Sequence, residues 1–408
     1  MITTFLPPVR KPIMTLICNE QTGFCEDTTK EDSVETNAKG QIQKRTEITK
    51  HQSGKTLWDW LGLAGTLAIP VLIVILGNQF QRKDQRRTEE QARTEKDIAN
   101  DNLRDAALEA YIDRISELLL DGKLISSNDN DPVRDVARTR TLTVLRRLKD
   151  DGERKARVLH FLYDAGLLDS VGKAPFIDLR DADFIGANLI NVTLHGANLM
   201  AANLEETNLK GANLIGANLE GAILVKTNLM EATLFGATLN GANLNGAILV
   251  KIHLNGANLN GANLMDTNLE GAILVKARLV KTTLEGANLK GANLMDANLE
   301  GAILVRAIMN GANLNGVNLE RAKLRDANLN RADLEGANLN RAILVKANLE
   351  GANLNRANLE GANLEEAFLK GARDCTPNQI KSAENWEKAH YDQDVRQKLG
   401  LPPEPLKG

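Results

Sequence analysis

A large apolar residue stands at every fifth position from Leu179 to Leu369, with no break in register. These 39 central positions hold leucine except at Phe184 and Met309, and the residue two places earlier is alanine in 31 units and small or β-branched in the others. A period of five fits neither the 3.6-residue turn of an α-helix nor the two-residue alternation of a strand. The pattern predicts a solenoid that turns a corner after each unit and buries both apolar positions inside a narrow coil.

Polar residues and glycine fill the rest of each unit, as in Ala212-Asn213-Leu214-Ile215-Gly216. Four such sides would close a coil of about 20 residues, and coils stacked at the strand spacing of about 4.8 Å would form a rod about 45–50 Å long. These repeats resemble the pentapeptide-repeat family. The resemblance implies a mainly β fold, the right-handed quadrilateral β-helix, which we assign to residues 176–373.

Residues 60–80 are 21 consecutive residues without a charge and predict a single transmembrane helix within residues 57–80. At about 1.5 Å per residue this helix would span about 30 Å, the thickness of the hydrocarbon core of a bilayer. The alternative, a buried core helix, lacks other apolar elements nearby to cover it. Tryptophans precede the segment and basic residues follow it, namely Trp58 and Trp60, then Arg82, Lys83, Arg86 and Arg87.

The basic residues after Phe80 predict that the repeats face the cytoplasm, because short cytoplasmic flanks carry an excess of lysine and arginine. A wider window weakens this bias, since Lys44, Arg45 and Lys50 then count on the other side. The start of the chain lacks the basic region and apolar core of a signal peptide.

Residues 1–56 are rich in Thr, Lys, Glu and Asp without a hydrophobic period, which predicts a disordered tail. Cys18 and Cys25 lie in it, either as free thiols or as a disulfide if the tail is in an oxidising compartment. Neither a second cysteine pair nor a histidine cluster accompanies them, which argues against a zinc site.

Helical domains are expected on both sides of the repeats. Residues 81–175 are charged and then amphipathic, with Asp131-Pro132 as a helix start. Residues 374–408 predict a C-terminal helical cap and tail that begins with a capping box at Thr376. Both would cover the exposed ends of the solenoid. A dimerisation or partner site is the alternative role of the first domain, which leaves a homo-oligomer open.

The layout as a whole is similar to membrane-anchored pentapeptide-repeat proteins common in cyanobacteria. The similarity extends to residues 137–148, 161–167 and 385–389. It implies a bacterial, cyanobacterial origin and a membrane location, and it brings no established biochemical activity.

The outward positions offer no constellation for catalysis. His195 and His253 both face outward but are 58 residues apart, without partners for a metal site or a triad. The glycines follow the five-residue rule rather than a nucleotide-binding motif. Adjacent carboxylates such as Glu205 and Glu206 lie on an open wall without a pocket around them, which is typical of solvated charges. We therefore expect no enzyme activity, cofactor or metal.

One outward feature departs from the polar rule. The sequence Ala-Ile-Leu-Val occurs five times, each time followed by Lys or Arg, and the first three copies are 25 residues apart. The leucine faces inward, so we expect the isoleucine and the valine to face water and the copies to climb diagonally around the rod. This predicts an apolar stripe that binds a partner or a lipid surface. Its candidate residues are Ile223, Val225, Lys226, Ile248, Val250, Lys251, Ile273, Val275 and Lys276.

The alternative for this stripe is duplication of a 25-residue segment, with the exposed apolar residues merely tolerated. The two later copies place Ile303 and Ile343 in the same column as Ile223, four and six coils further on if each coil has about 20 residues.

The leading hypothesis for function is a non-enzymatic, membrane-tethered scaffold that presents the rod to an unknown protein partner. Inhibition of DNA topoisomerases by DNA mimicry, known for some members of the family, is the alternative. Mimicry needs a strongly acidic rod, whereas the repeats hold 20 acidic and 17 basic residues. The formal net charge of -3 also gives no sign of a nucleic-acid partner. A regulatory component of a membrane transport system is a third possibility that no residue favours.

Overall fold

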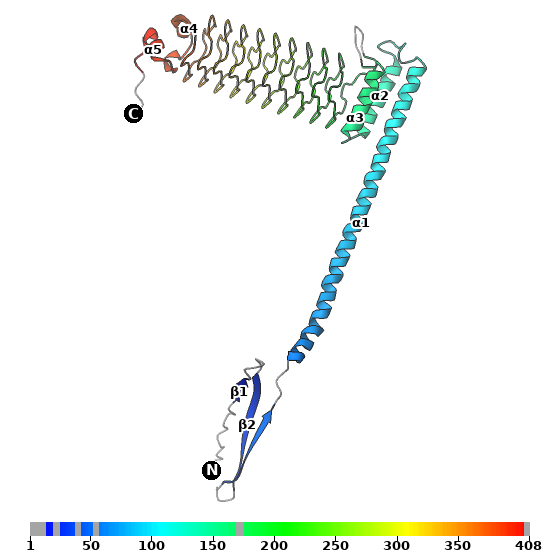
Figure 1. The fold of residues 1–408 in the computed structure, drawn as a ribbon. Coiled ribbons are helices and arrows are strands. Elements are labelled where there is room, and N and C mark those ends of the chain that lie inside the picture. The colour runs from blue at the N-terminus through cyan, green and yellow to red at the C-terminus, as the bar shows by residue number, and fades with distance from the viewer. Residues whose placement is uncertain (1–13, 19–24, 37–41, 52–56, 169–174, 404–408) are drawn as a thin grey trace, which may run out of the picture. The chain divides into compact units, whose positions relative to one another are not determined.

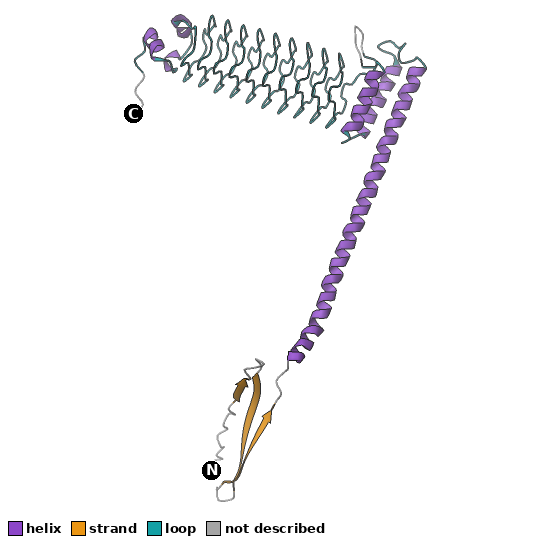
Figure 2. Ribbon diagram, in the orientation of Figure 1, coloured by secondary structure: helices purple, strands orange, loops and turns teal. Residues whose placement is uncertain are grey.

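The computed structural model describes residues 14–18, 25–36, 42–51, 57–168 and 175–403. The chain divides into two compact units, residues 1–99 and 100–408. Helix α1 (Leu57–Leu120) runs from the first unit into the second. Figures 1 and 2 show the elements within each unit.

The first unit begins with an antiparallel sheet of strands β1 (Met14–Cys18), β2 (Cys25–Thr36) and β3 (Ile42–His51) in that order. Composition predicted a disordered tail here, and the structure differs. Threonine and isoleucine recur in these strands, and their β-branched side chains favour extended backbone, which the composition argument did not weigh. The register sets Cys18 opposite Cys25. The rest of the predicted tail lies outside the described residues.

Helix α1 contains the predicted membrane segment and continues through the charged residues that we expected to begin a separate domain. Among the described residues it is the one helix that is long and apolar enough to cross a membrane, judged by length and composition. The large apolar side chains from Ile69 to Leu76 are exposed, and Pro70 lies inside the helix without ending it. The side chains of Trp58 and Trp60 lie outside the described part.

In the second unit, helices α2 (Pro132–Arg147) and α3 (Gly152–Asp164) cover the first coil of repeats (Figure 1). Lys155 of α3 is fully buried, and its Nζ donates to a carboxylate oxygen of Asp183 at 3.0 Å. The first coil has no preceding coil to pair with, so these helices supply partners to its polar groups. This is the arrangement expected of a cap.

Two further contacts hold α2 and α3 on the coil. Arg138 donates to the carbonyl oxygen of Arg180 at 2.9 Å and forms an ion pair with Asp181 at 3.3 Å. A β carbon on Gly152 would stand 2.3 Å from the carbonyl oxygen of Gly186, so only glycine permits this approach of helix to coil.

A single arginine of α3, Arg154, joins this helix to α1 within the second unit through ion pairs with aspartates. Arg154 forms ion pairs with Asp101 at 2.7 Å and Asp105 at 2.8 Å, and with Asp151, the residue that caps α3. Burial of Asp151 raises its pKa, but hydrogen bonds from the backbone and side chain of Arg154 outweigh this and hold the pKa below its usual range. Asp131 caps α2 as the sequence predicts.

Every position that the five-residue pattern assigns to the interior is buried. All the central residues, and all the residues two places before them, are at most 2% exposed. Where the earlier residue is threonine, its hydroxyl donates to a backbone carbonyl, as Thr207 does to Phe184 at 2.8 Å. The predicted division into inward and outward positions is confirmed.

Residues 20 positions apart pair in parallel bridges, such as Asn203 with Ile223 and Ile223 with Asn243. Four units therefore make one coil, and the repeats form a four-sided β-helix. Each side contributes single bridging residues rather than a longer strand, because the chain turns a corner after every unit. Figure 2 accordingly draws the coil without strand arrows.

The C-terminal end of the solenoid is covered by α4 (Pro377–Lys381), the short helix η1 (Trp386–Lys388) and α5 (Gln393–Leu399). The predicted capping box at Thr376 is present. The backbone ladder continues into this segment, because His390 donates its N–H to Ala367 at 2.8 Å. The C-terminal cap thus extends the coil by backbone pairing.

Candidate interaction surface

The five Ala-Ile-Leu-Val units lie on the outer wall of the β-helix. Because bridges join residues 20 apart, each outward position forms a column along the solenoid. Ile223, Ile248 and Ile273 fall in three different columns on successive sides. The column of Ile223 also contains Ile303 and Ile343. The first three units therefore climb diagonally around the wall.

Three of the five isoleucines of these units are exposed, whereas none of the five valines is. Ile223 and Ile248 are 38% and 39% exposed, and Ile273 is half-buried. The valines follow the inward leucine and stand nearer the corner of the coil. Four of them are half-buried, namely Val225, Val250, Val275 and Val305.

Val345, in the last of the five units, is only 6% exposed. The expectation that every valine of these units faces water is therefore wrong at this position. Arg325 and Glu365 stand at the equivalent positions one coil before and one coil after it. The carbonyl oxygen of Val345 accepts the N–H of Asp326 at 3.0 Å.

Two exposed aromatic residues of the outer wall, Phe235 and Phe368, are not among the residues named from the sequence. Phe235 is 40% exposed, and its ring meets the imidazole of His253 edge-on, with 6.2 Å between ring centroids. His253 in turn bridges Ile273. Phe235 follows the buried Leu234, so the five-residue rule could have found it as a large apolar residue in an outward position. We define the apolar patch as Phe235, Ile248, Val250, His253, Ile273 and Val275.

Each of the five units is followed by a basic residue with a left-handed backbone. The φ angles are 54° at Lys226, 55° at Lys251, 57° at Lys276, and 59° at both Arg306 and Lys346. This conformation costs a residue other than glycine about 1–2 kcal/mol. Glycine occupies it at many other corners of the coil. Residues other than glycine also adopt it at corners outside these units, as Ala201, Glu206 and Lys281 do. What distinguishes the five apolar units is that the corner residue after each of them is a cation.

The lysines beside the patch differ in their partners. Lys226 pairs with Glu206 of the preceding coil at 3.2 Å, and both side chains are exposed, so the pair contributes little to stability. Within the part of the chain that the structure describes, Lys251 and Lys276 form no ion pair. Two unneutralised cations therefore lie next to the apolar patch.

Another wall of the coil carries a ladder of asparagines. The side-chain amide of Asn338 donates to Asn318 at 3.1 Å, and that of Asn358 donates to Asn338 at 3.3 Å. The Oδ1 of Asn338 also accepts the N–H of Asn340 at 3.1 Å. These polar groups satisfy one another along the column. This column is thus polar, in contrast to the apolar patch.

The described residues contain no group of three His, Cys, Asp or Glu side chains arranged to hold a metal ion. Cys375, a free and partly buried thiol near the C-terminal cap, has a pKa raised by desolvation. A raised pKa lowers the thiolate fraction and with it the reactivity of the thiol.

A family model for pentapeptide repeats matches the chain in eight copies, over residues 177–214, 212–249, 252–291, 292–331 and 332–371. No curated protein sequence matches the chain. Among solved structures, HetL from the cyanobacterium Nostoc sp. strain PCC 7120, a pentapeptide repeat protein involved in heterocyst differentiation regulation, is 34% identical. That match covers 51% of this chain and 94% of HetL, with a TM-score of 0.46.

Two other solved structures illustrate the range of similarity. A further pentapeptide repeat protein from Nostoc PCC 7120 is 31% identical over 28% of this chain and 84% of its own, with a TM-score of 0.12. QnrB1, a plasmid-mediated fluoroquinolone resistance protein, is 18% identical over 46% of this chain and 96% of its own, with a TM-score of 0.42.

Proposed function

Because this chain belongs to the pentapeptide-repeat family, we propose that it is a non-enzymatic scaffold whose right-handed quadrilateral β-helix binds a protein partner through the apolar patch. The observation that carries this proposal is the recurrence of an outward isoleucine–valine pair beside a strained lysine or arginine. Lys251 and Lys276 would meet carboxylates at the rim of the partner's apolar surface.

The path of the first three Ala-Ile-Leu-Val units around the coil favours a protein partner over a lipid surface. Ile223, Ile248 and Ile273 lie on three successive sides of the coil. A flat bilayer can contact one side of a four-sided rod, whereas a protein can curve around a corner. Phe235 and Ile273 share one side with His253, so this side would form the centre of the contact.

We also propose that residues 57–80 of helix α1 anchor the chain in a membrane, with the repeats on the cytoplasmic side of a bacterial, cyanobacterial cell. The exposed apolar side chains between Ile69 and Leu76 support this, because such a surface is unfavourable in water. Residues 81–175 then join the anchor to the solenoid (176–373), and residues 374–408 close its far end.

The patch is tested with the full chain in its native membranes. Replacing Ile248 with Asn and Val250 with Thr should abolish co-purification of a cross-linked partner and leave the circular dichroism unchanged. Thr238→Asn, on a wall that already carries asparagines, is the matched control and should leave recovery intact. Unchanged recovery with the patch variant would contradict the proposal.

The anchor is tested separately by carbonate extraction of membranes. The full chain should remain in the membrane pellet, and a chain that lacks residues 57–80 should be released. Release of the full chain would disprove the anchor while leaving the patch as a property of the solenoid.

A further inference from the structure

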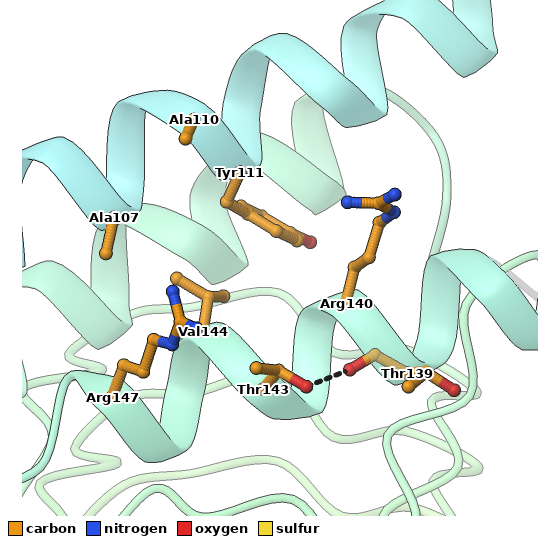
Figure 3. Close-up of a pocket in the computed structure, with 8 residues that line it drawn as sticks. All are labelled: Ala107, Ala110, Tyr111, Thr139, Arg140, Thr143, Val144 and Arg147. Carbon is orange, nitrogen blue, oxygen red and sulfur yellow. Dashed lines mark hydrogen bonds between the residues drawn. The ribbon is translucent and has the colours of Figure 1, made fainter.

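The seam between helices α1 and α2 in the second unit carries a groove that the proposed function does not use. One part has a volume of about 330 Å³ and is drawn in Figure 3. A second part of about 460 Å³ shares Ala107 and Arg147 with the first, so the two are continuous. We call this the α1–α2 groove. Its walls include Leu103, Arg104, Ala107 and Ala110 of α1, and Arg140 and Arg147 of α2.

The lining of the groove combines apolar side chains with the polar Thr139, Thr143 and Asn100, and its floor is held by Tyr111. Tyr111 is buried, its hydroxyl is 2.8 Å from Oγ1 of Thr141, and its ring meets Phe161 edge-on at 6.4 Å. Ala107 and Ala110 have small side chains, which lets a third helix approach the usual 8–10 Å between helix axes. Leu103 is 69% exposed at the other end of the groove. These features suit the apolar face of a helix.

The rim of the groove is basic without compensation. Figure 3 shows Arg140 and Arg147 on α2, on the side that faces α1. Among the described residues neither arginine has an ion pair or side-chain hydrogen bond, and the groove is lined by no carboxylate. Arginines elsewhere in the same helices do have carboxylate partners, as Arg134 with Asp129 at 2.9 Å.

Arg140 and Arg147 are seven residues apart on one helix, which is two turns or about 10.5 Å along the axis. A partner helix with two carboxylates seven residues apart presents its charges at the same spacing. Arginine binds a carboxylate through two parallel hydrogen bonds, so the match also fixes the position of the helix along the groove. We infer that the α1–α2 groove binds an acidic amphipathic helix of a protein partner, with small or branched apolar residues between its carboxylates.

The test uses the full chain in detergent and a fluorescent helical peptide of about 20 residues. The peptide contains Ala, Leu and Gln with two Glu seven residues apart; a control peptide has one Glu moved by two positions, onto another face. Fluorescence anisotropy should show that the first peptide binds more tightly and that added salt weakens it. Arg147→Glu should weaken binding about tenfold, because it replaces attraction by repulsion.

Arg146→Glu provides the matched control, since Arg146 is the exposed neighbour of Arg147, has the same charge and does not line the groove. It should leave peptide binding unchanged. Equal loss in the two variants, or equal binding of the two peptides, would overturn the inference. Arg147→Gln serves if circular dichroism shows that the glutamate variant unfolds α2. Ile248→Asn in the apolar patch should leave peptide binding intact, which separates this groove from the proposed function.

Discussion

Ile248 and Leu249 are neighbours in the chain, yet Leu249 is fully buried inside the coil and Ile248 is 39% exposed on its outer wall. The two regions follow different rules. Inside, the central positions hold leucine, phenylalanine or methionine, and the positions two places earlier hold alanine, threonine, valine or isoleucine. The narrow, closely packed coil excludes charged side chains from these positions. Outside, Asn, Thr, Ile and Lys occur in the column of Ile223, and Asn, Thr, His and Ile occur in that of Ile273, without disturbing the bridges.

This difference separates stability from function within a single five-residue unit. The interior residues determine the coil and are shielded from any partner, so they carry no information about what the protein binds. The outer wall is free to vary, so a departure from its polar rule is a signal about binding. Phe235 and the isoleucine–valine pairs are such departures, and the asparagine ladder shows what the wall contains where no partner is proposed.

The largest effect is expected inside the coil. Leu249→Ala should lower the free energy of unfolding by about 2–5 kcal/mol, because a buried side chain is lost and a cavity remains. Ile248→Ala, one residue away, should change it by less than about 0.5 kcal/mol, as is usual for exposed positions. Chemical denaturation followed by circular dichroism measures both. Similar losses of unfolding free energy in the two variants would contradict the claim that inward residues determine stability and outward residues do not.

A smaller effect of opposite sign is expected at the corners. Lys251→Gly should stabilise the fold by about 1–2 kcal/mol, because glycine adopts a positive φ without strain. Lys281→Gly is the matched control, since both lysines have a φ of 55° and Lys281 lies outside the apolar patch. Both variants should raise the denaturation midpoint, but only Lys251→Gly should weaken partner recovery. Equal recovery would show that the charge at Lys251 has no role in binding.

The smallest effect concerns polar groups in the interior. Thr207→Val keeps the shape of the side chain and removes the hydrogen bond from Oγ1 to the carbonyl of Phe184. The carbonyl retains its bond from the N–H of Ala187, so we expect a loss of only about 1 kcal/mol. Denaturation curves of the variant test this, and a loss as large as that of Leu249→Ala would mean that the interior depends on the hydrogen bonds of its threonines as much as on the packing of its leucines.

The sequence predicted the solenoid because its period of five is carried by each unit in turn. It also predicted the caps at Asp131 and Thr376, since capping depends on residues only a few positions apart. The sequence did not predict the ion pairs between the N-terminal cap and the first coil. Lys155 looks like a surface lysine in the sequence, and its partner Asp183 is 28 residues away.

The departures from prediction have similar causes. Helix α1 runs on past residue 80 because the charged residues that follow are themselves helix formers and no glycine or proline interrupts them there. The strands β1, β2 and β3 depend on pairing between segments, which composition does not describe. Val345 occupies the same place in its unit as the half-buried Val225 and Val250, so the five-residue pattern alone does not predict that it is buried.

The central claim, that the apolar patch is a binding surface, is tested most directly by photo-cross-linking in native membranes. A photoreactive residue is placed at Val250 in the patch, and in a second protein at Asn258 on the asparagine wall. The account predicts one discrete cross-linked protein from position 250, lost on Ile273→Asn, and none from position 258. The same products from both positions, or no product from position 250, would contradict it.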